Sequence, residues 1–409
     1  MSRAVVIGAG IAGLSAAWHL QEHGYEVTIV ERTGVASGSS WGNAGWLAPG
    51  KAIPLAHPSL WRYGPKAMFD PDAALYVPRR IDPRLWSFLA RFMAHSTKRA
   101  WNTTMAALTP IDKLALESFD ELNVGGVQAW TREGPFIVGF EHESQSKGFK
   151  DEIAGAVRHG QDVPFAQLDD PQLLAPQLSD AVSVAYRLEG QRFLEPGPYV
   201  ETLASAVEQR GAEMRSGLEV ASVTSTGHPT VELSSGERIT ADTVVIATGA
   251  WLPQLVRPLG VKVPVQAGRG YSFTVETENP VEYPVYLPDQ RLACTPYQGR
   301  FRIAGTMEFR GPDEPFQPRR IQAMVKQARK LFTGIDLENR QDEWVGSRPV
   351  TPDGLPLVGA TKAPNVYVAG GHGMWGMVLG PATGKLLAQQ IATGTVHRAI
   401  KQFDPLRKA

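Results

Sequence analysis

The sequence predicts a mixed α/β fold in which a parallel-sheet domain is assembled from separated stretches of chain and an antiparallel-sheet domain is inserted into it. Two stretches indicate the first domain. A short apolar strand, a glycine-rich turn and a helix are expected in AVVIGAGIAGLSAAWHL and again in NVYVAGGHGMWGMVLGPATGKLL. Between them, GYSFTVET and RFRIAGTMEF are typical of strands in an antiparallel sheet. The length of 409 residues is enough for two domains.

The N-terminal stretch has each part of a dinucleotide-binding turn. After the strand AVVI, Gly8, Gly10 and Gly13 follow with G-x-G-x-x-G spacing and open a helix. Gly8 permits the tight turn, Gly10 lets a pyrophosphate approach the backbone, and Gly13 lets the helix pack on the strand. Glu31 ends the second strand, EVTIVER, where its carboxylate can accept hydrogen bonds from ribose hydroxyls. We therefore predict a Rossmann-like dinucleotide site, with FAD and NAD both open at this point.

Composition excludes several classes of protein. Lys plus Arg and Asp plus Glu both total 41, so there is no basic excess for binding nucleic acid. The one cysteine, Cys294, forms no intrachain disulfide and fits a reducing compartment. No apolar run is long enough to span a bilayer, and the first strand leaves no room for a signal peptide. The sequence therefore predicts a cytoplasmic protein, and no metal site is predicted.

The order of the elements predicts where the chain passes between domains. We expect residues 1–50, 195–255 and 345–409 to form the cofactor domain, and residues 51–194 and 256–344 to form the second domain with connecting helices. Helices are expected in PYVETLASAVEQRGAEM and RRIQAMVKQARKLF, and a strand entering a turn in TVVIATGAW.

Another expected helix, RLWSFLARFMAHSTK at residues 84–98, has a basic side and an apolar side. Its apolar side consists of Leu85, Phe88, Leu89 and Phe92, and its basic side includes Arg84, Arg91 and Lys98. One interpretation is an ordinary surface helix whose apolar side packs on the second domain. The alternative is a helix whose apolar side rests on an anionic membrane surface.

Four motifs make the chain resemble the FAD-dependent D-amino-acid oxidase/dehydrogenase superfamily, which includes glycine and sarcosine oxidases. They are VVIGAGIAGLSAAWHL, SSWGNAGW, TVVIATGAW, and GSRPVTPDGLPLVG with NVYVAGGHGMWGM. The segments NAG, GRGYSF, RIAGTMEF and TPDGLPLVG are similar to those of bacterial D-amino acid dehydrogenases and their glyphosate-oxidoreductase-like relatives. The resemblance spans almost the whole chain and selects FAD. It implies noncovalent binding, because Cys294 in RLACTPYQ does not match the motif through which some relatives attach the flavin.

The resemblance implies a set of FAD-binding residues. The loop after the second strand is expected to run along the flavin ring, where glycine lets backbone N–H groups approach. Trp41 or Trp46 is expected to wall off the ring or the substrate, and core packing is the alternative for both. The expected FAD contacts are Gly8, Gly10, Ile11, Ala12, Gly13, Glu31, Arg32, Ser39, Ser40, Asn43, Ala44, Gly45, Trp46, Val220, Thr248, Gly249, Trp251, Gly371, His372, Gly373, Met374 and Gly376.

The resemblance also implies which residues handle the substrate. Oxidising an α-amino acid moves a hydride from Cα to the flavin, so positioning groups are expected and a side-chain base is not required. Arg348 occupies the position of the family's carboxylate-binding arginine, where a guanidinium pairs with two oxygens in one plane. Tyr271 is expected to add a hydroxyl donor or a ring wall, and a packed strand tyrosine is the alternative. His372 is expected to contact the flavin ring or to cap its turn.

Two further positions bear on the substrate and the cofactor. Some relatives have a second arginine where this chain has Met374, which favours substrates with apolar or modest side chains. Pro381 is expected near the first turn of the last helix, whose N-terminus would stabilise the anionic reduced ring.

The predicted function is FAD-dependent oxidation of an amino acid, with a D-amino acid favoured, to an imine that hydrolyses to a 2-oxo acid and ammonia. One alternative is a secondary-amine oxidase or dehydrogenase acting on sarcosine, glycine, a cyclic imino acid or a glyphosate-like compound. Another is an FAD-bearing subunit of an electron-transfer complex. A pure NAD-binding module is disfavoured by the C-terminal motifs. The electron acceptor stays open between a quinone, a dye-like or protein acceptor and oxygen. The resemblance to dehydrogenases favours a quinone or dye, with a peripheral contact to the inner face of the membrane as an accompanying hypothesis.

Overall fold

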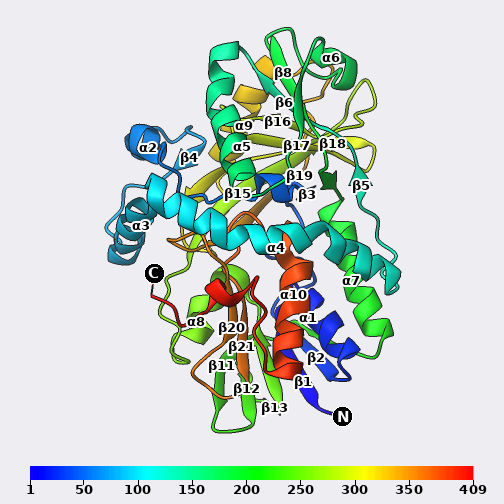
Figure 1. The fold of residues 1–409 in the computed structure, drawn as a ribbon, viewed down its shortest axis with the longest axis vertical. Helices are drawn as coiled ribbons and strands as arrows, with labels where there is room; N and C mark the ends of the chain where they lie inside the picture. The colour runs from blue at the N-terminus through cyan, green and yellow to red at the C-terminus, as the bar shows by residue number, and fades with distance from the viewer. Residues whose placement is uncertain (409) are drawn as a thin grey trace.

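The computed structural model describes the backbone of residues 1–408 and their side chains apart from those of residues 62, 63 and 65–67. In Figure 1 a sheet flanked by helices fills the lower part of the molecule and a second, larger sheet fills the upper part. Helix α4 (Lys98–Val124) crosses between them. The mixed α/β fold predicted from the sequence is confirmed.

The lower sheet has six strands in the order β10-β2-β1-β14-β21-β20. They are β10 (Glu213–Ser216), β2 (Glu26–Glu31), β1 (Arg3–Ile7), β14 (Thr243–Ile246), β21 (Val366–Gly370) and β20 (Leu357–Ala360). Neighbouring strands are parallel except for the edge pair of β20 and β21. The strands come from three separate stretches of the chain. The domain boundaries at residues 50, 195, 255 and 345 stay a prediction.

Both faces of this sheet are covered, which explains its uniformly apolar strands. Val6 packs in a core with α1 (Ile11–Glu22), α7 (Pro196–Gln209) and α10 (Gly376–Thr393). Val5 and Ile7 point to the opposite face and pack with α8 (Leu252–Val256) and a small antiparallel sheet. That sheet consists of β11 (Val220–Ser225), β12 (Pro229–Leu233) and β13 (Arg238–Thr240). Because successive side chains of a strand face opposite ways, both sets must be apolar.

The upper sheet has nine strands, of which eight follow the order β19-β15-β18-β17-β16-β6-β8-β7 and β4 pairs with β18. They are β19 (Gln341–Val350), β15 (Gln266–Val275), β18 (Arg300–Phe309), β17 (Leu292–Tyr297), β16 (Val285–Leu287), β6 (Phe136–Phe140), β8 (Val184–Leu188), β7 (Phe165–Leu168) and β4 (Leu75–Tyr76). The two strands predicted in GYSFTVET and RFRIAGTMEF are β15 and β18, which pair antiparallel. Helices α5 (Ser146–Arg158), α6 (Pro171–Leu174) and α9 (Pro318–Leu331) flank this sheet. A third, small sheet joins β3 (Trp46–Leu47), β9 (Arg192–Phe193) and β5 (Arg132–Glu133).

The structure corrects the prediction of one helix over residues 84–98. Helix α3 (Pro83–His95) ends before Ser96, and α4 begins separately at Lys98, where the Thr97 side chain caps its N-terminus. The apolar side of α3 is covered by protein, because Phe88 and Phe92 pack against Phe309 of β18. This side of α3 is therefore closed to lipid. No helix in the described part of the chain is long and apolar enough to cross a membrane.

Candidate active site

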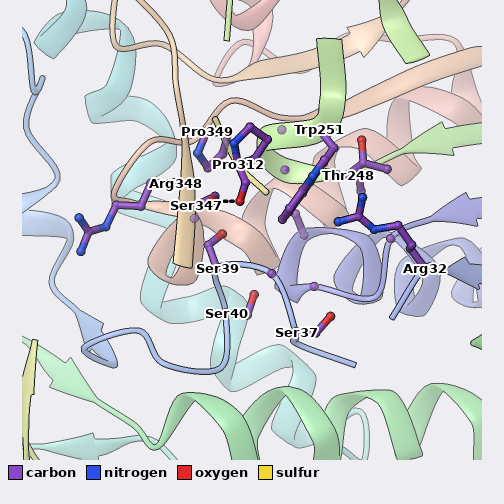
Figure 2. Close-up of a pocket in the computed structure, with 18 of the residues that line it drawn as sticks. Arg32, Ser37, Ser39, Ser40, Thr248, Trp251, Pro312, Ser347, Arg348 and Pro349 are labelled. Atoms are coloured by element: carbon purple, nitrogen blue, oxygen red, sulfur yellow. Dashed lines mark hydrogen bonds between the residues drawn. The ribbon is translucent and has the colours of Figure 1, made fainter. Parts of the chain in front are cut away.

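A cavity of about 360 Å³ lies where the carboxyl ends of the lower sheet meet the upper sheet. Of the expected site residues, those that line it are Gly8, Gly10, Ile11, Ala12, Glu31, Arg32, Ser39, Ser40, Asn43, Val220, Thr248, Gly249, Trp251, Arg348, His372, Gly373, Met374 and Gly376. Figure 2 shows part of this lining, with Ser37, Ser39 and Ser40 along one side and Trp251 beside Arg32 at one end. Ligands of open α/β sheets bind at this edge, outside the carboxyl ends of the strands.

The dinucleotide turn leaves no room for side chains at two of its glycines. Gly8 has a φ of +110°, and a Cβ there would lie 2.6 Å from the carbonyl oxygen of Ala247. A Cβ at Gly13 would lie 2.0 Å from the carbonyl oxygen of Gly8. Gly13 therefore packs beneath the turn and does not line the cavity, as expected of the glycine that lets the helix approach the strand. Because no side chain stands at Gly8, the backbone of the turn borders the cavity directly.

Two helix N-termini open into the same cavity. Helix α1 begins at Ile11 and α10 begins at Gly376, and neither has an acidic residue in its first turn. Gly384 of α10 packs so closely on α1 that a Cβ there would lie 2.4 Å from the carbonyl carbon of Ser15. The two helices consequently lie side by side and bring their two N-terminal turns to one space. Pro381, which was expected near the first turn of this helix, lies inside α10, five residues after its start at Gly376.

The end of the cavity near β2 carries an acidic and a basic group. The Glu31 carboxylate accepts hydrogen bonds from the amides of Ala9 and Thr33, both at 2.9 Å, which fix its orientation. Arg32 lies over the ring of Trp251, 4.7 Å from the centroid. The carboxylate of Asp313 accepts from Trp251 Nε1 at 2.9 Å and pairs with Arg32 at 3.2 Å. Asp313 belongs to the loop after β18, so this contact joins the two sheets across the end of the cavity.

The loop after β2 only partly follows the expectation. Asn43 lines the cavity, whereas Ala44, Gly45 and Trp46 do not. Gly45 packs on the chain directly after β9, since a Cβ there would lie 2.1 Å from the carbonyl oxygen of Leu194. Trp46 turns into the core beneath the upper sheet, where its Nε1 donates to Thr295 Oγ1 at 3.0 Å. For Trp46, core packing is therefore the correct interpretation.

Trp344 explains one glycine of this loop that sequence reasoning left unassigned. A Cβ at Gly42 would lie 2.1 Å from the Trp344 ring, and a Cβ at Gly346 would lie 1.8 Å from it. The indole thus lies flat between the loop and its own strand, β19. Trp344, Gly346 and Arg348 alternate along β19 and share one face. The ring therefore separates the loop from Arg348.

Arg348 is partly buried and has no anionic partner among the described residues. Its Nη1 donates to the carbonyl of Thr306 at 3.1 Å, and no carboxylate of the described residues lies within 4.0 Å of the guanidinium. Loss of solvation lowers the pKa of Arg348 to about 10. Figure 2 shows the side chain leaving β19 on the side away from Trp251 and Arg32. A partly buried cation without an anionic partner is able to bind an anion that the chain does not supply.

The backbone around Arg348 is shaped for its side chain. A Cβ at Gly270 of β15 would lie 2.0 Å from the guanidinium, so only glycine leaves space there. The pairing of β15 with β18 shifts between Arg269 and Tyr271, and Thr306 lies in the extra segment of β18. Thr306 has a φ of +48°, which is strained for a β-branched residue. This β-bulge aims the Thr306 carbonyl at Arg348.

The structure corrects the expected role of Tyr271. Its side chain lies on the α9 side of the sheet, among residues such as Phe316, and does not line the cavity. The hydroxyl donates to the buried carboxylate of Glu308 at 2.5 Å. Loss of solvation and this carboxylate together raise the pKa of Tyr271. Because Gly270 faces Arg348, its neighbour Tyr271 must face the opposite side.

His372 lines the cavity as an uncharged side chain. Its Nε2 lies 3.0 Å from the hydroxyl of Thr383 in α10. Burial lowers the pKa of His372 to about 4, so the ring carries no charge near neutral pH. Gly371 packs against Leu357 and is not among the residues that line the cavity. Cys294 is buried in the core of the upper sheet, away from the cavity lining.

Several lining residues were missed by sequence reasoning. They are chiefly Ser37, Leu218, Glu219, Gln254, Pro312, Asp313, Glu314, Ser347, Pro349 and Met377. The loop of Pro312, Asp313 and Glu314 has no motif, and only the fold brings it to the cavity. Ser347 holds it there, because its Oγ donates to the carbonyl of Pro312 at 3.1 Å, as Figure 2 shows. No cluster of three or more His, Cys, Asp or Glu able to hold a metal occurs among the described residues.

Comparison with known proteins identifies the family of this chain. A family model described as FAD dependent oxidoreductase, DAO, matches residues 3–390. The chain belongs to this family. Two curated relatives of this oxidoreductase are named D-amino acid dehydrogenase. The one from Methylobacterium sp. (strain 4-46) is 30% identical over 402 residues, and the one from Methylobacterium nodulans is 29% identical over 401 residues. In both cases 95% of each chain is covered.

Solved structures share the fold of this oxidoreductase over its whole length. Glycine oxidase from Geobacillus kaustophilus superposes with a TM-score of 0.75 at 21% identity, covering 100% of both chains. Iminodiacetate oxidase from Chelativorans sp. BNC1 superposes with a TM-score of 0.71 at 20% identity, covering 98% of this chain and 99% of the other.

The residues of this oxidoreductase fit FAD. The turn that Gly8 and Gly13 keep bare and the N-terminus of α1 suit a pyrophosphate, and Glu31 suits a ribose. The N-terminus of α10, without an acidic residue in its first turn, suits the electron-rich side of the ring. FAD supplies the acceptor for a hydride taken from the substrate. The assignment of single residues to parts of FAD remains a proposal.

Proposed function

We propose that this oxidoreductase oxidises the Cα–N bond of an α-amino acid, with D-amino acids favoured, to an imine that hydrolyses to a 2-oxo acid and ammonia. The observation that carries the proposal is Arg348, a partly buried guanidinium that lines the cofactor cavity and has no carboxylate partner among the described residues. The two relatives named D-amino acid dehydrogenase support this class of substrate.

In this proposal Arg348 binds the substrate carboxylate. The Thr306 carbonyl holds one amino group of the guanidinium, which leaves further N–H donors for two carboxylate oxygens in one plane. Pairing with an anion also offsets the loss of solvation of the guanidinium. The carboxylate then fixes Cα relative to the cavity, so that orientation supplies much of the rate. The amine must lose its proton before oxidation. His372 is uncharged near neutral pH, so the neutral form of the amine can lie beside it.

The side chain of the substrate is proposed to be apolar or of modest polarity. Met374 lines the cavity at the position where some relatives have a second arginine. A thioether adapts to apolar groups of different shapes, and it offers no charge to a second carboxylate.

The proposal is tested with the purified holoenzyme on matched substrates. D- and L-amino acids, N-methyl amino acids and the corresponding decarboxylated amines are compared by kcat/KM with an artificial dye as acceptor. We expect a D-amino acid with an apolar side chain to be best and its decarboxylated amine to be poorer by a factor of about 100, as for loss of a charge-assisted pair. Equal activity on the decarboxylated amine contradicts the proposal. A preference for the N-methyl substrates supports the secondary-amine alternative.

We also propose that a quinone or dye accepts the electrons better than oxygen does, and that the chain reaches the quinone at an anionic membrane surface. The buried side of α3 cannot make this contact. Four exposed apolar side chains near α3 are able to make it. They are Trp61 and Phe69 of α2 (Leu60–Phe69), Ile81, and Trp86 of α3. Exposed Arg79, Arg84 and Arg99 lie nearby in the chain. Aromatic rings among basic residues are typical of peripheral membrane contacts.

Two measurements test this second proposal. Turnover in air is compared with turnover with a quinone analogue, and peroxide formation at the quinone rate contradicts the acceptor preference. Sedimentation with anionic vesicles at low salt tests the membrane contact. Trp86→Ala should weaken it, whereas Trp130→Ala should not, because Trp130 precedes β5 on the opposite side of the molecule from α3. Equal binding by both variants, or none by the parent, contradicts the contact.

A further inference from the structure

A buried arginine of the upper sheet holds the loop after β2 from behind. Arg302 of β18 donates from Nη1 to the carbonyl of Trp41 at 3.1 Å and to the carbonyl of Asn43 at 3.4 Å. Its guanidinium lies over the ring of Tyr297, 3.7 Å from the centroid, and 5.2 Å from the centroid of Trp41. The two rings confine the guanidinium to one plane.

Two hydroxyl groups of the same sheet hold the carbonyls that Arg302 does not reach. Ser272 Oγ donates to the carbonyl of Gly42 at 2.8 Å, and Thr295 Oγ1 donates to the carbonyl of Ala44 at 2.6 Å. Four successive carbonyls, from residues 41 to 44, are therefore bound by side chains of β15, β17 and β18. The loop is fixed to the upper sheet along its whole inner side.

The amides of this loop divide into two kinds. In a planar trans peptide the N–H group points away from the carbonyl of the same unit. The amide of Asn43 donates to Ser40 within the loop at 3.3 Å, and the amide of Gly45 donates to Asn43 Oδ1 at 2.9 Å. The amides of Gly42 and Ala44 have no acceptor among the described residues. These two amides belong to the peptide units whose carbonyls Arg302 binds.

Arg302 is also a cation that no carboxylate of the described residues contacts directly. Its side chain is fully buried, and no carboxylate of the described residues lies within 4.0 Å of it. A cation at the oxygen end of a peptide unit polarises that unit and makes its N–H group a stronger donor. Asn43, between the two free amides, lines the cofactor cavity. Gly42 and Ala44 do not line the cavity themselves, so the two strengthened donors lie on either side of the one lining residue.

We propose that Arg302 is a positioning residue for the cofactor: it fixes and polarises two peptide units so that the amides of Gly42 and Ala44 bind acceptor atoms of the flavin ring. The positive charge of Arg302, on the far side of this loop from the ring, also favours the reduced and more negative form of the ring. The proposal depends on the family's cofactor and is independent of the substrate proposed above.

Arg302→Met tests the proposal, because methionine keeps the length of the stem and removes the charge. We expect the dissociation constant of FAD, measured by flavin fluorescence, to rise about tenfold, as for the loss of hydrogen bonds to a charged group. We expect the midpoint potential of the bound flavin to fall by about 30 mV, which corresponds to a tenfold change for a two-electron couple. Arg302→Lys should keep the potential near that of the parent while binding FAD more weakly.

Arg300→Met is the matched control. Arg300 lies two residues earlier on the same strand and pairs with Asp342 at 3.1 Å, away from the loop. It should change neither the affinity for FAD nor the potential. If Arg302→Met and Arg300→Met have the same affinity and potential, the proposal is wrong.

A second comparison decides the matter if Arg302→Met does not fold. Thr295→Val frees the carbonyl of Ala44, whose peptide unit has its amide bound inside the loop. It should therefore affect FAD binding less than Arg302→Lys does. An equal loss of FAD affinity in Thr295→Val and Arg302→Lys would mean that general anchoring of the loop, and not the two free amides, matters, and this would overturn the proposal.

Discussion

The guanidinium of Arg348 occupies the space where Gly270 lacks a side chain: a Cβ at Gly270 would lie 2.0 Å from Nη2. The two residues come from neighbouring strands, β15 and β19, and the missing side chain of one sets the position of the other. The contact also explains why the segment GRGYSF carries a glycine in the middle of a strand, where glycine is otherwise unfavourable.

Gly270→Ala should therefore displace Arg348. We expect the KM for an amino acid to rise about tenfold or more, since a charge-assisted pair loses its geometry. FAD binding should stay unchanged, because Gly270 does not line the cavity. Gly148→Ala, at a helix position with open space around it, is the control and should leave KM unchanged. An unaltered KM in Gly270→Ala would contradict the role of this space.

Arg348→Lys should raise KM strongly, because an ammonium cannot bind two carboxylate oxygens in one plane. The expected loss in kcat/KM corresponds to about 2 kcal/mol, or roughly thirtyfold. Activity on a decarboxylated amine should fall much less. Arg187→Lys, at an exposed site, should behave as the parent does. Unchanged kinetics on an amino acid would exclude Arg348 as the carboxylate site.

Thr306→Gly should relieve backbone strain, because a left-handed φ of +48° costs a β-branched residue about 1–2 kcal/mol. We expect urea denaturation to show a free energy of unfolding that is unchanged or higher by up to about 1 kcal/mol, since glycine also adds freedom to the unfolded chain. KM should rise, because the carbonyl that holds Arg348 becomes less constrained. Thr240→Gly, in an ordinary exposed strand, should lower stability instead. If Thr306→Gly lowered the free energy of unfolding as much as Thr240→Gly does, the bulge would not be strained.

His372 should make the protein less stable in acid. Its pKa is lowered to about 4 in the folded protein, whereas the unfolded chain binds a proton at the usual value of 6.5. Between these values the unfolded state binds more protons, so stability falls as the pH decreases from about 6.5 to 4, by on the order of 3 kcal/mol. His372→Gln should remove this part of the pH dependence, as measured by urea denaturation at several pH values. The same slope in parent and variant would assign the acid sensitivity to other groups.

The fold and one end of the site could be predicted from local sequence. The dinucleotide turn is a contiguous motif, in which Gly8, Gly13 and Glu31 are placed by two strands with one turn and one helix between them. Each residue type there answers a local steric or hydrogen-bonding need, so spacing alone is informative. The strands of this domain were predicted in distant stretches because each stretch contains a short apolar strand. Such a strand is typical of a sheet that is buried on both faces.

The tertiary structure alone decided the end of the cavity at Arg348. Alternation places Gly270 and Tyr271 on opposite faces of β15, but the sequence does not say which face meets the cavity, and the expected role of Tyr271 failed there. Other contacts likewise join residues more than 250 positions apart. Asp313 pairs with Arg32, and Arg302 donates a hydrogen bond to the carbonyl of Trp41. Sequence motifs report needs that a short segment meets by itself. Contacts between segments depend on strand register and β-bulges, which are set only when the whole sheet packs.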